Sequence, residues 1–317
     1  MTDKQTVLAV VGPTASGKSA LALALAKEYG GEIVSCDSMQ VYRDMNIGTA
    51  KPTAEEMAEV RHHMIDVADP FEDFSCADYV KAAAEVIENC ASRGKLPILC
   101  GGTGLYLDAL LRKNDFAPDT TDEAVRRELA EFAERHGAAA LHAELVRIDP
   151  ASAEATHPNN IKRVIRAIEI YRVSGMTKTE LDRRSLEGGD RYDATVVGLR
   201  YADREILYRR IERRVDQMIA DGLLEETRVL MEKGVFDRNR TAAQAIGYKE
   251  ILPYCRGECT LAEAAEELKT ATRRYAKRQM TWFSAKPYVK WVDVTDEARQ
   301  KTFEEIVNNA KVLFRKA

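Results

Sequence analysis

The chain has 317 residues, 45% of them hydrophobic and 31% charged, with a formal net charge of −4. This size and balance are typical of a folded globular protein and exclude nucleic-acid binding through overall positive charge. No apolar run approaches the roughly 20 residues needed to span a bilayer, and six separate cysteines favour a reducing compartment. We therefore expect a cytoplasmic protein with no membrane association.

Strand and helix patterns alternate over the first hundred residues. Short apolar runs predict strands, while a Ser75-x-x-Asp78 capping box opens a helix that ends at Gly94. In chain order, we predict strands at Thr6–Val11, Glu32–Cys36 and Leu96–Cys100, and a helix through Leu21 and Leu25 that ends at Gly30. Strands joined by helices form parallel sheets, and ligands bind at the carboxyl ends of such strands.

From about Asp119 the strand pattern stops and a helical segment begins. The predicted elements that follow are helices at Glu123–Arg135, Ala138–Val146 and Asn160–Val173, a strand at Thr195–Leu199, helices at Arg204–Ala220, Leu223–Lys233 and Leu261–Phe283, a strand at Val289–Val294 and a helix at Glu297–Phe314. We expect an α/β fold in which residues 1–118 and 193–317 form a parallel-sheet core flanked by helices. Residues 119–192 would form an inserted helical domain.

The segment Gly12-Pro-Thr-Ala-Ser-Gly-Lys-Ser19 matches the P-loop pattern and lies between a predicted strand and a predicted helix. Its glycines allow a turn whose amides converge on an anion, and the helix N-terminus adds partial positive charge. We expect Lys18 to reach a terminal phosphate and Ser19 to hold Mg²⁺. The core is therefore P-loop NTPase-like, with phosphate-binding residues Gly12, Thr14, Ala15, Ser16, Gly17, Lys18 and Ser19.

A carboxylate, Asp37, follows the second predicted strand, where the ligand edge of the sheet would bring it beside the P-loop. It could take a proton from an attacking nucleophile, or its side chain could stabilise a turn. The position of Asp37 in the sequence favours neither interpretation over the other. The third strand ends in Gly101-Gly-Thr-Gly104, where many ATPases place an aspartate. The P-loop thus indicates phosphate binding but not the reaction.

Positive charge is concentrated in two stretches. No acidic residue occurs between Glu267 and Asp293, an interval that carries Lys269, Arg273, Arg274, Lys277, Arg278, Lys286 and Lys290. Tyr275 and Trp282 in the same interval are expected to pack into the core rather than to stack on bases. In the third helix of the inserted domain, Lys162, Arg163 and Arg166 lie opposite an apolar stripe, a pattern that fits a solvated face as well as RNA contact.

The pair His62-His63 is a further candidate for metal ligation, and Asp66 is its only obvious partner in the sequence. Metal sites need several ligands at suitable spacing. A structural role for the two histidines is therefore favoured.

Six segments together resemble the bacterial tRNA dimethylallyltransferase family, also called tRNA isopentenyltransferases. In chain order they are Gly12–Ser19, Asp37-Ser38 with Ile47–Pro52, Gly101–Thr103, His157-Pro-Asn159, Gly247-Tyr248 and Lys277-Arg-Gln279-x-x-Trp282. Only the P-loop is distinctive alone. All six in the right order are highly specific, and they extend over essentially the whole chain.

The resemblance implies a prenyltransferase that moves the dimethylallyl group of dimethylallyl diphosphate onto the exocyclic amine of the adenine 3′ to the tRNA anticodon, with Mg²⁺ as cofactor. It implies that Asp37 is the general base and that Thr103 and Arg126 contact the diphosphate or the reacting centre. The implied tRNA contacts are Asp37, Ser38, Met39, Gln40, Lys162, Arg163, Val164, Ile165, Arg166, Gln244, Gly247, Tyr248 and Lys249. From the basic interval we add Arg273, Arg274, Lys277 and Arg278 as phosphate contacts.

Three alternatives stay open from the residues alone: a P-loop kinase that uses ATP to phosphorylate a small hydroxyl compound, a nucleotide-regulated RNA-binding module, and a prenyltransferase of free adenine nucleotides. The basic interval argues against the kinase, and Asp37 and Thr103 beside the P-loop favour an enzyme. The partners that we expect are dimethylallyl diphosphate and tRNA, through its anticodon stem-loop, and the protein is expected to be a monomer. The identity of the modified tRNAs and the order of substrate binding stay open.

Overall fold

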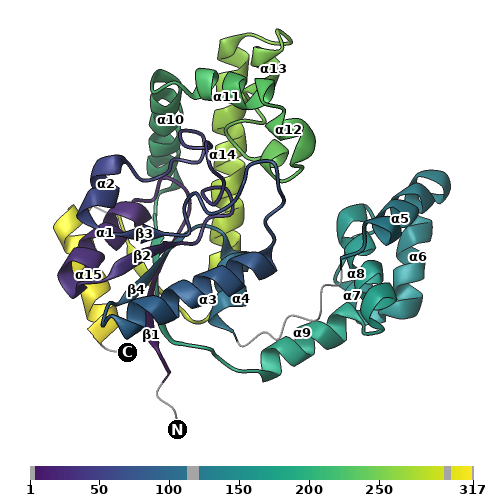
Figure 1. Ribbon diagram of the computed structural model, residues 1–317, viewed down its shortest axis with the longest axis horizontal. Coiled ribbons are helices and arrows are strands. Elements are labelled where there is room, and N and C mark those ends of the chain that lie inside the picture. The colour runs from purple at the N-terminus through teal and green to yellow at the C-terminus, as the bar shows by residue number, and fades with distance from the viewer. Residues whose placement is uncertain (1–3, 113–120, 296–300, 316–317) are drawn as a thin grey trace. The chain divides into compact units, whose positions relative to one another are not determined.

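The computed structural model of the chain describes residues 4–112, 121–295 and 301–315. Its centre is a parallel sheet with the strand order β3-β2-β4-β1-β5-β6 (Figure 1). The strands are β1 (Thr6–Val11), β2 (Glu32–Ser35), β3 (His62–His63), β4 (Pro97–Gly101), β5 (Asp193–Arg200) and β6 (Val289–Asp293). The predicted α/β fold class is confirmed, because strands and helices alternate along the chain and every strand pair is parallel.

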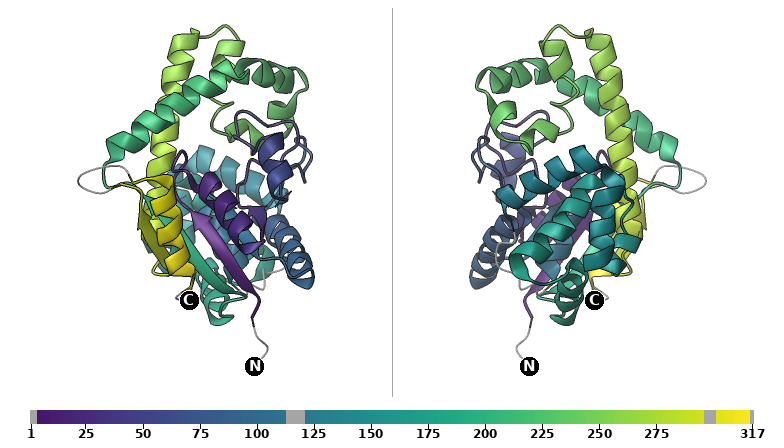
Figure 2. Two further views of the ribbon diagram at one scale, coloured as in Figure 1. Left: turned by 90° about the vertical axis from the view of Figure 1, so that its left-hand side faces the viewer. Right: turned by 90° about the vertical axis from the view of Figure 1, so that its right-hand side faces the viewer.

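Helices cover both faces of this sheet, and β1 shows why its sequence is apolar at almost every position. Leu8 and Val10 belong to the core beneath α1 (Lys18–Tyr29) and α15 (Phe303–Arg315). Val7 and Ala9 belong to the core on the opposite face, beneath α3 (Cys76–Ser92) and α4 (Gly104–Leu111). A strand buried on both sides cannot alternate between polar and apolar residues. Figure 2 shows the same layering from the two sides.

A further group of helices lies at the carboxyl end of the sheet (Figure 1). They are α10 (Arg204–Ala220), α11 (Leu223–Glu232), α12 (Val235–Arg238), η1 (Ala242–Gln244), α13 (Leu252–Cys255) and α14 (Leu261–Ser284), while the short α2 (Ala54–Glu59) lies beside α1. Most of them share a core with the loop that follows β2: Val41 and Tyr42 pack with Leu223 and Tyr248. This packing holds the loop that follows β2 near the carboxyl ends of the strands. A parallel sheet binds ligands at that edge.

The chain divides into two compact units, and the second is Arg112–Arg191. It contains α5 (Glu123–His136), α6 (Ala138–Ile148), α7 (Pro150–Glu154), α8 (Ile161–Ser174) and α9 (Lys178–Glu187). Leu129, Leu141 and Ile168 lie in its own hydrophobic core. The boundary expected at residue 119 falls within 113–120, which lie outside the described residues, and so does the expected start of the last helix at Glu297.

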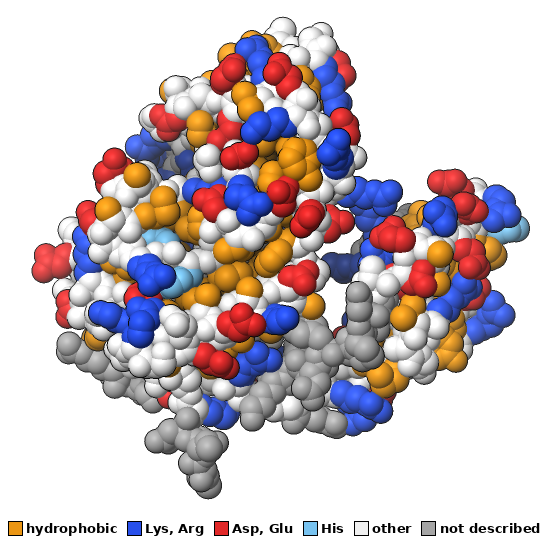
Figure 3. All heavy atoms as spheres, in the orientation of Figure 1, with side chains coloured by type: hydrophobic (Ala, Val, Ile, Leu, Met, Phe, Trp, Pro, Cys, Tyr) orange, Lys and Arg blue, Asp and Glu red, His pale blue; other side chains and the backbone are white. Residues whose placement is uncertain are grey.

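Several short elements have no counterpart in the sequence prediction. Strand β3 has two residues, too few for an alternating pattern, and α4 begins directly after the glycines that end β4. The capping box at Ser75 and Asp78 is confirmed by reciprocal hydrogen bonds. None of the described helices is both long and apolar enough to cross a membrane. On the face shown in Figure 3, acidic and basic side chains are interspersed, in keeping with the nearly balanced totals of 51 and 47.

Candidate active site

The P-loop turns from β1 into α1 through backbone conformations that glycine adopts readily. Gly12 has φ 148° and Gly17 has φ 95°, and Ala15, at φ 61°, is a non-glycine residue in the left-handed region. A Cβ on Gly12 would lie 3.0 Å from the carbonyl oxygen of Leu199. The Ser16 hydroxyl is buried and has no hydrogen-bond partner in the described part of the chain. The loop thus surrounds the N-terminus of α1 as the sequence motif predicts.

Lys18 lies in a small cavity of about 80 Å³ together with Thr14, Ser19 and Asp37. Its ammonium group lies 3.3 Å from the carbonyl oxygen of Pro13. Burial lowers the pKa of Lys18, while Asp37 is among the neighbours that raise it. A cation with so little water around it gains strongly from an anionic ligand.

Two arginines of α10, Arg210 and Arg214, approach the P-loop, and the sequence prediction missed both. Arg210 Nε donates to the carbonyl oxygen of Ala15 at 2.8 Å, and Arg214 lines the small cavity. Burial lowers the pKa of Arg214, and Asp37 opposes that shift. A sequence signal exists, because these residues lie four apart beside the buried positions Ile211 and Val215, but it is also typical of a solvated helix edge. Together with Lys18 they form a basic cluster at the loop.

Asp37 lies two residues after the end of β2 and shapes the turn there. Its Oδ1 accepts the backbone N–H groups of Met39 at 2.9 Å and Gln40 at 3.3 Å. The hydrogen bonds to this carboxylate within the described residues all reach Oδ1, which leaves Oδ2 available. The turn-forming interpretation is thus correct, and the fixed orientation also suits a general base.

The Gly101-Gly102 pair permits a very close approach of β4 to the Asp37 turn. A Cβ on Gly101 would lie 2.0 Å from the carbonyl oxygen of Cys36. Thr103, which follows, accepts the backbone N–H of Ser38 through its Oγ1 at 3.1 Å. In this structure Thr103 therefore holds the turn that presents Asp37, and its expected contact with substrate stays a prediction.

Gln279 of α14 connects two of these segments, a role that the sequence alone did not reveal. Its Oε1 accepts the backbone N–H of Thr14, and its Nε2 donates to the carbonyl oxygen of Gly102. The side chain is 5% exposed. A residue of the basic interval is thus a buried link between the P-loop and the end of β4.

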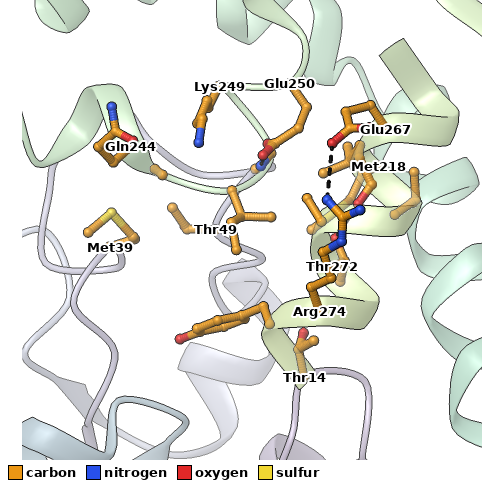
Figure 4. A pocket seen from close by; sticks show the side chains of 18 of the residues that line it. Thr14, Met39, Thr49, Met218, Gln244, Lys249, Glu250, Glu267, Thr272 and Arg274 are labelled. Carbon is orange, nitrogen blue, oxygen red and sulfur yellow. Dashed lines mark hydrogen bonds and ion pairs between the residues drawn. The ribbon is translucent and has the colours of Figure 1, made fainter. Parts of the chain in front are cut away.

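A larger cavity of about 910 Å³ adjoins the small one, and Thr14, Asp37, Thr49, Arg214 and Tyr275 line both. Figure 4 shows side chains from the P-loop, the loop after β2, α10, residues 244–250 and α14 around it, with Arg274 and Glu267 of α14 joined by an ion pair. The predicted tRNA contacts that line it are Asp37, Ser38, Met39, Gln244, Gly247, Lys249, Arg274 and Arg278. Segments more than 200 residues apart in the sequence therefore meet at one site.

Other predicted tRNA contacts do not face this cavity. Tyr248 is fully buried and donates its hydroxyl to Glu226 at 2.6 Å, so its side chain cannot meet RNA. Arg273 is held by Glu212 at 2.9 Å and Glu266 at 3.0 Å, which neutralise its charge within the fold. Lys277 is exposed on α14. Gln40 lines only the small cavity.

The expectation that Tyr275 and Trp282 pack into the core is wrong. Tyr275 lines both cavities, and Trp282 is 38% exposed. The Trp282 ring lies against Gly104, where a Cβ would come within 2.2 Å of it, and under the ammonium group of Lys286 at 5.0 Å. The Tyr275 ring is thus available to a ligand in the site, whereas Trp282 is exposed but lines neither cavity.

The remaining predicted residues belong to the Arg112–Arg191 unit. Arg126 Nε pairs with Glu169 at 2.8 Å, and Arg166 pairs with the same buried carboxylate at 2.7 Å. Lys162 and Arg163 are exposed and Ile165 is half-buried, whereas Val164 is fully buried in the core of the unit. A side-chain contact of Val164 with tRNA is therefore excluded in this conformation, and the roles of the others stay predictions.

His63 belongs to a buried group near the amino end of the sheet. Its Nε2 lies 2.7 Å from Glu32 Oε2, and Cys90 Sγ lies 3.4 Å from the same oxygen. These residue types can hold metals, and their ligand atoms lie within 4.8 Å of one another. However, Arg93 binds both oxygens of Glu32, at 2.5 and 2.7 Å, and its charge opposes a cation. The structural interpretation of the histidines agrees with this network, which does not include Asp66.

The donor atoms beside Lys18 fit a hard cation. The Ser19 hydroxyl and the Asp37 carboxylate both line the small cavity. Oxygen donors of this kind, completed by phosphate oxygens and water, are what Mg²⁺ prefers. Ser19 and Asp37 therefore fit a Mg²⁺ ion bound together with phosphate, and the cofactor stays a prediction.

Comparison with known proteins agrees with this geometry. The model of the IPP transferase family matches residues 40–286. A tRNA dimethylallyltransferase of Halalkalibacterium halodurans is 48% identical over 305 residues, which cover 96% of each chain. Among solved structures, a full-length tRNA isopentenylpyrophosphate transferase from Bacillus halodurans has a TM-score of 0.72 and 44% identity, with 99% of this chain and 97% of that chain covered. A eukaryotic dimethylallyltransferase described as acting on tRNA has a TM-score of 0.78 and 31% identity, with 92% and 74% covered. The resemblance inferred from the sequence is therefore confirmed, and the chain belongs to the IPP transferase family.

Proposed function

We propose that this protein transfers the dimethylallyl group of dimethylallyl diphosphate to N6 of the adenine 3′ to the anticodon in tRNA and releases diphosphate. The observation that carries the proposal is that Asp37 lines both the P-loop cavity and the larger cavity beside it. A donor bound through its diphosphate and an acceptor base in the larger cavity would meet at this carboxylate. Relatives that are 44% to 49% identical and bear the name tRNA dimethylallyltransferase support the same reaction.

Asp37 would act as the general base. The adenine amine is a poor nucleophile because its lone pair is delocalised into the ring. As N6 bonds to C1 of the dimethylallyl group, an N6 proton moves to Asp37 Oδ2, and the C1–O bond breaks with its electron pair going to the diphosphate. The amides of Met39 and Gln40 orient the carboxylate through Oδ1. Positioned general bases contribute about 10²- to 10⁴-fold in rate.

The basic cluster would stabilise the leaving diphosphate, whose negative charge grows in the transition state. Lys18, Arg210 and Arg214 approach the loop from two helices. Charge stabilisation is strongest where water is excluded and the donors are already in place. Ser19 would help to hold Mg²⁺, a cofactor that would supply further positive charge for the leaving group.

The larger cavity would receive the adenine after the base has turned out of its stacked position in the anticodon loop. Unstacking a base costs a few kcal/mol, and the cost is least in a single-stranded loop. Gln244 and Lys249 on one wall and Arg274 and Arg278 on α14 offer polar and cationic groups to the nucleotides around it. A tRNA substrate agrees with a cytoplasmic location.

The test is product identification. Unmodified tRNA and labelled dimethylallyl diphosphate are incubated with the protein and Mg²⁺, the RNA is digested, and the labelled nucleoside is identified. We expect label on N6 of the adenosine next to the anticodon. Label on free adenine nucleotides alone, or phosphate transfer from ATP to a small hydroxyl compound, would refute the proposal.

A further inference from the structure

The carboxylate of Glu226, in the first turn of α11, binds two segments that are distant in sequence. It accepts the backbone N–H groups of Asn46 at 3.0 Å, Ile47 at 2.9 Å and Gly48 at 3.1 Å. It also accepts the hydroxyl of Tyr248 at 2.6 Å. Three successive backbone N–H groups form a nest that favours an anion, so the negative charge is an essential part of this arrangement.

We propose that Glu226 is a positioning residue for the acceptor substrate: it fixes the loop that follows β2 against Tyr248 and so sets the wall of the tRNA cavity next to Asp37. The inference rests on the proposed function. It concerns a residue that does not line the cavity, and it therefore predicts an effect on tRNA rather than on the diphosphate donor.

The two segments that Glu226 joins approach each other very closely. A Cβ on Gly48 would lie 2.5 Å from Cζ of Tyr248, and a Cβ on Gly247 would lie 2.9 Å from the carbonyl oxygen of Gly48. Both glycines line the larger cavity. The shape of this wall therefore depends on the loop staying in place over the Tyr248 ring.

A continuous series of hydrogen bonds links this loop to Asp37. Gln40 Nε2 donates to the carbonyl oxygens of Thr49 at 3.2 Å and Ala50 at 3.0 Å. The backbone N–H of Gln40 in turn donates to Asp37 Oδ1. Displacement of the Asn46–Gly48 nest would thus reach the turn that orients the catalytic carboxylate.

The neighbouring Glu225 offers a matched control. It lies on the same turn of α11, its side chain is 72% exposed, and its carboxylate is 3.7 Å from Arg228 NH1. Glu226, in contrast, has no ion pair within the described residues and binds only backbone amides and a phenol. Glu225→Gln removes the same charge from the same helix without touching the loop.

The experiment compares steady-state kinetics of the full chain, Glu226→Gln and Glu225→Gln with unmodified tRNA and dimethylallyl diphosphate. Glutamine keeps the size of the Glu226 side chain, but an NH₂ group replaces one carboxylate oxygen. That group would face the backbone N–H groups and the Tyr248 hydroxyl, which are themselves donors. We expect KM for tRNA to rise about tenfold or more in Glu226→Gln, the usual effect of losing hydrogen bonds to a charged group, with KM for the donor unchanged. Glu225→Gln should match the parent.

Tyr248→Phe gives a second, milder variant in case Glu226→Gln folds poorly. It keeps the ring beneath Gly48 and removes one hydrogen bond, so KM for tRNA should rise less, and the effects of the two substitutions should not add in the double variant. Normal tRNA kinetics in Glu226→Gln would overturn the inference while leaving the proposed function intact. Equal weakening of both substrates together with a lower melting temperature would show a purely structural role and also overturn it. An inactive parent would overturn both proposals.

Discussion

Gln279 and Thr14, 265 residues apart, are joined by a hydrogen bond of 2.8 Å from the Thr14 backbone N–H to Gln279 Oε1. The same amide donates to Gly102 O at 3.1 Å. One buried side chain of α14 thus fixes the P-loop relative to the end of β4. Phosphate binding depends on where the loop amides point, so the helix takes part in shaping the anion site.

Gln279→Leu should therefore weaken diphosphate binding as well as stability. The variant leaves a buried donor and a buried acceptor unpaired, which costs about 1–3 kcal/mol for each group. We expect a lower melting temperature and weaker inhibition by inorganic pyrophosphate. Ser284→Ala, an exposed change near the end of the same helix, is the control. Unaltered pyrophosphate inhibition in Gln279→Leu would show that the P-loop keeps its geometry without this link.

Arg214→Ala should weaken binding of inorganic pyrophosphate by about 10- to 100-fold, the range for a lost charge-assisted hydrogen bond. Arg214 lines the small cavity, whereas the adjacent Arg213 is exposed on α10. Arg213→Ala should therefore bind pyrophosphate like the parent. Calorimetric titration of both variants measures the difference, and equal affinities would remove Arg214 from the anion site.

Asp37→Asn tests the general base without removing the turn. The asparagine oxygen can still accept the backbone N–H groups of Met39 and Gln40, but the amide cannot take a proton. We expect kcat to fall by about 10²-fold or more with tRNA affinity nearly unchanged. Asp44→Asn, an exposed change in the same loop, should be silent in both assays. Near-normal turnover of Asp37→Asn in single-turnover assays would exclude Asp37 as the base.

Much of the fold, but less of the site, follows from local sequence patterns. The strand β1, the P-loop and α1 are contiguous, so each predicts the next. Arg210 and Arg214 escaped prediction because basic residues beside an apolar stripe are also typical of solvated helices. Glu226 and Gln279 act on segments about 180 and 265 residues away, and no local pattern carries that information. The surroundings of Trp282 do not follow from local sequence either, because its ring packs against Gly104, which lies in another element.

Acid should destabilise the protein partly through Glu32. Hydrogen bonds from Arg93, with a contribution from His63, lower the pKa of Glu32 from 4.5 to about 2 although burial opposes the shift. A carboxyl with a lowered pKa stabilises the fold above its unfolded pKa, and this stabilisation is lost as the pH falls from about 4.5 to about 2. The stability difference between parent and Glu32→Gln, measured by urea unfolding, should therefore be large at pH 7 and shrink over that interval. Glu59→Gln, which alters an exposed ion pair, should differ little from the parent at any pH. A difference for Glu32→Gln that does not depend on pH would contradict this account.

Two arginines test how the protein holds tRNA. Arg163 is exposed in the Arg112–Arg191 unit, and Arg274, with a side chain 69% exposed, lines the larger cavity. If each contacts a phosphate, its loss should reduce the slope of log affinity against log salt by roughly 0.7 to 0.9, because fewer counterions are released. Arg163→Ala and Arg274→Ala should then bind tRNA more weakly at low salt and depend less on salt.

The donor provides the control for this experiment. Pyrophosphate should bind both variants as it binds the parent, since we expect it to contact Lys18 and the P-loop amides rather than these arginines. Lys27→Ala, which removes an exposed charge from the last turn of α1, should leave the tRNA slope unchanged. If Arg163 and Arg274 are exposed to solvent but do not contact RNA, both variants should also show the salt dependence of the parent. Parent slopes in both arginine variants would therefore mean that other residues contact tRNA and would reopen the alternative of a free adenine nucleotide as the acceptor.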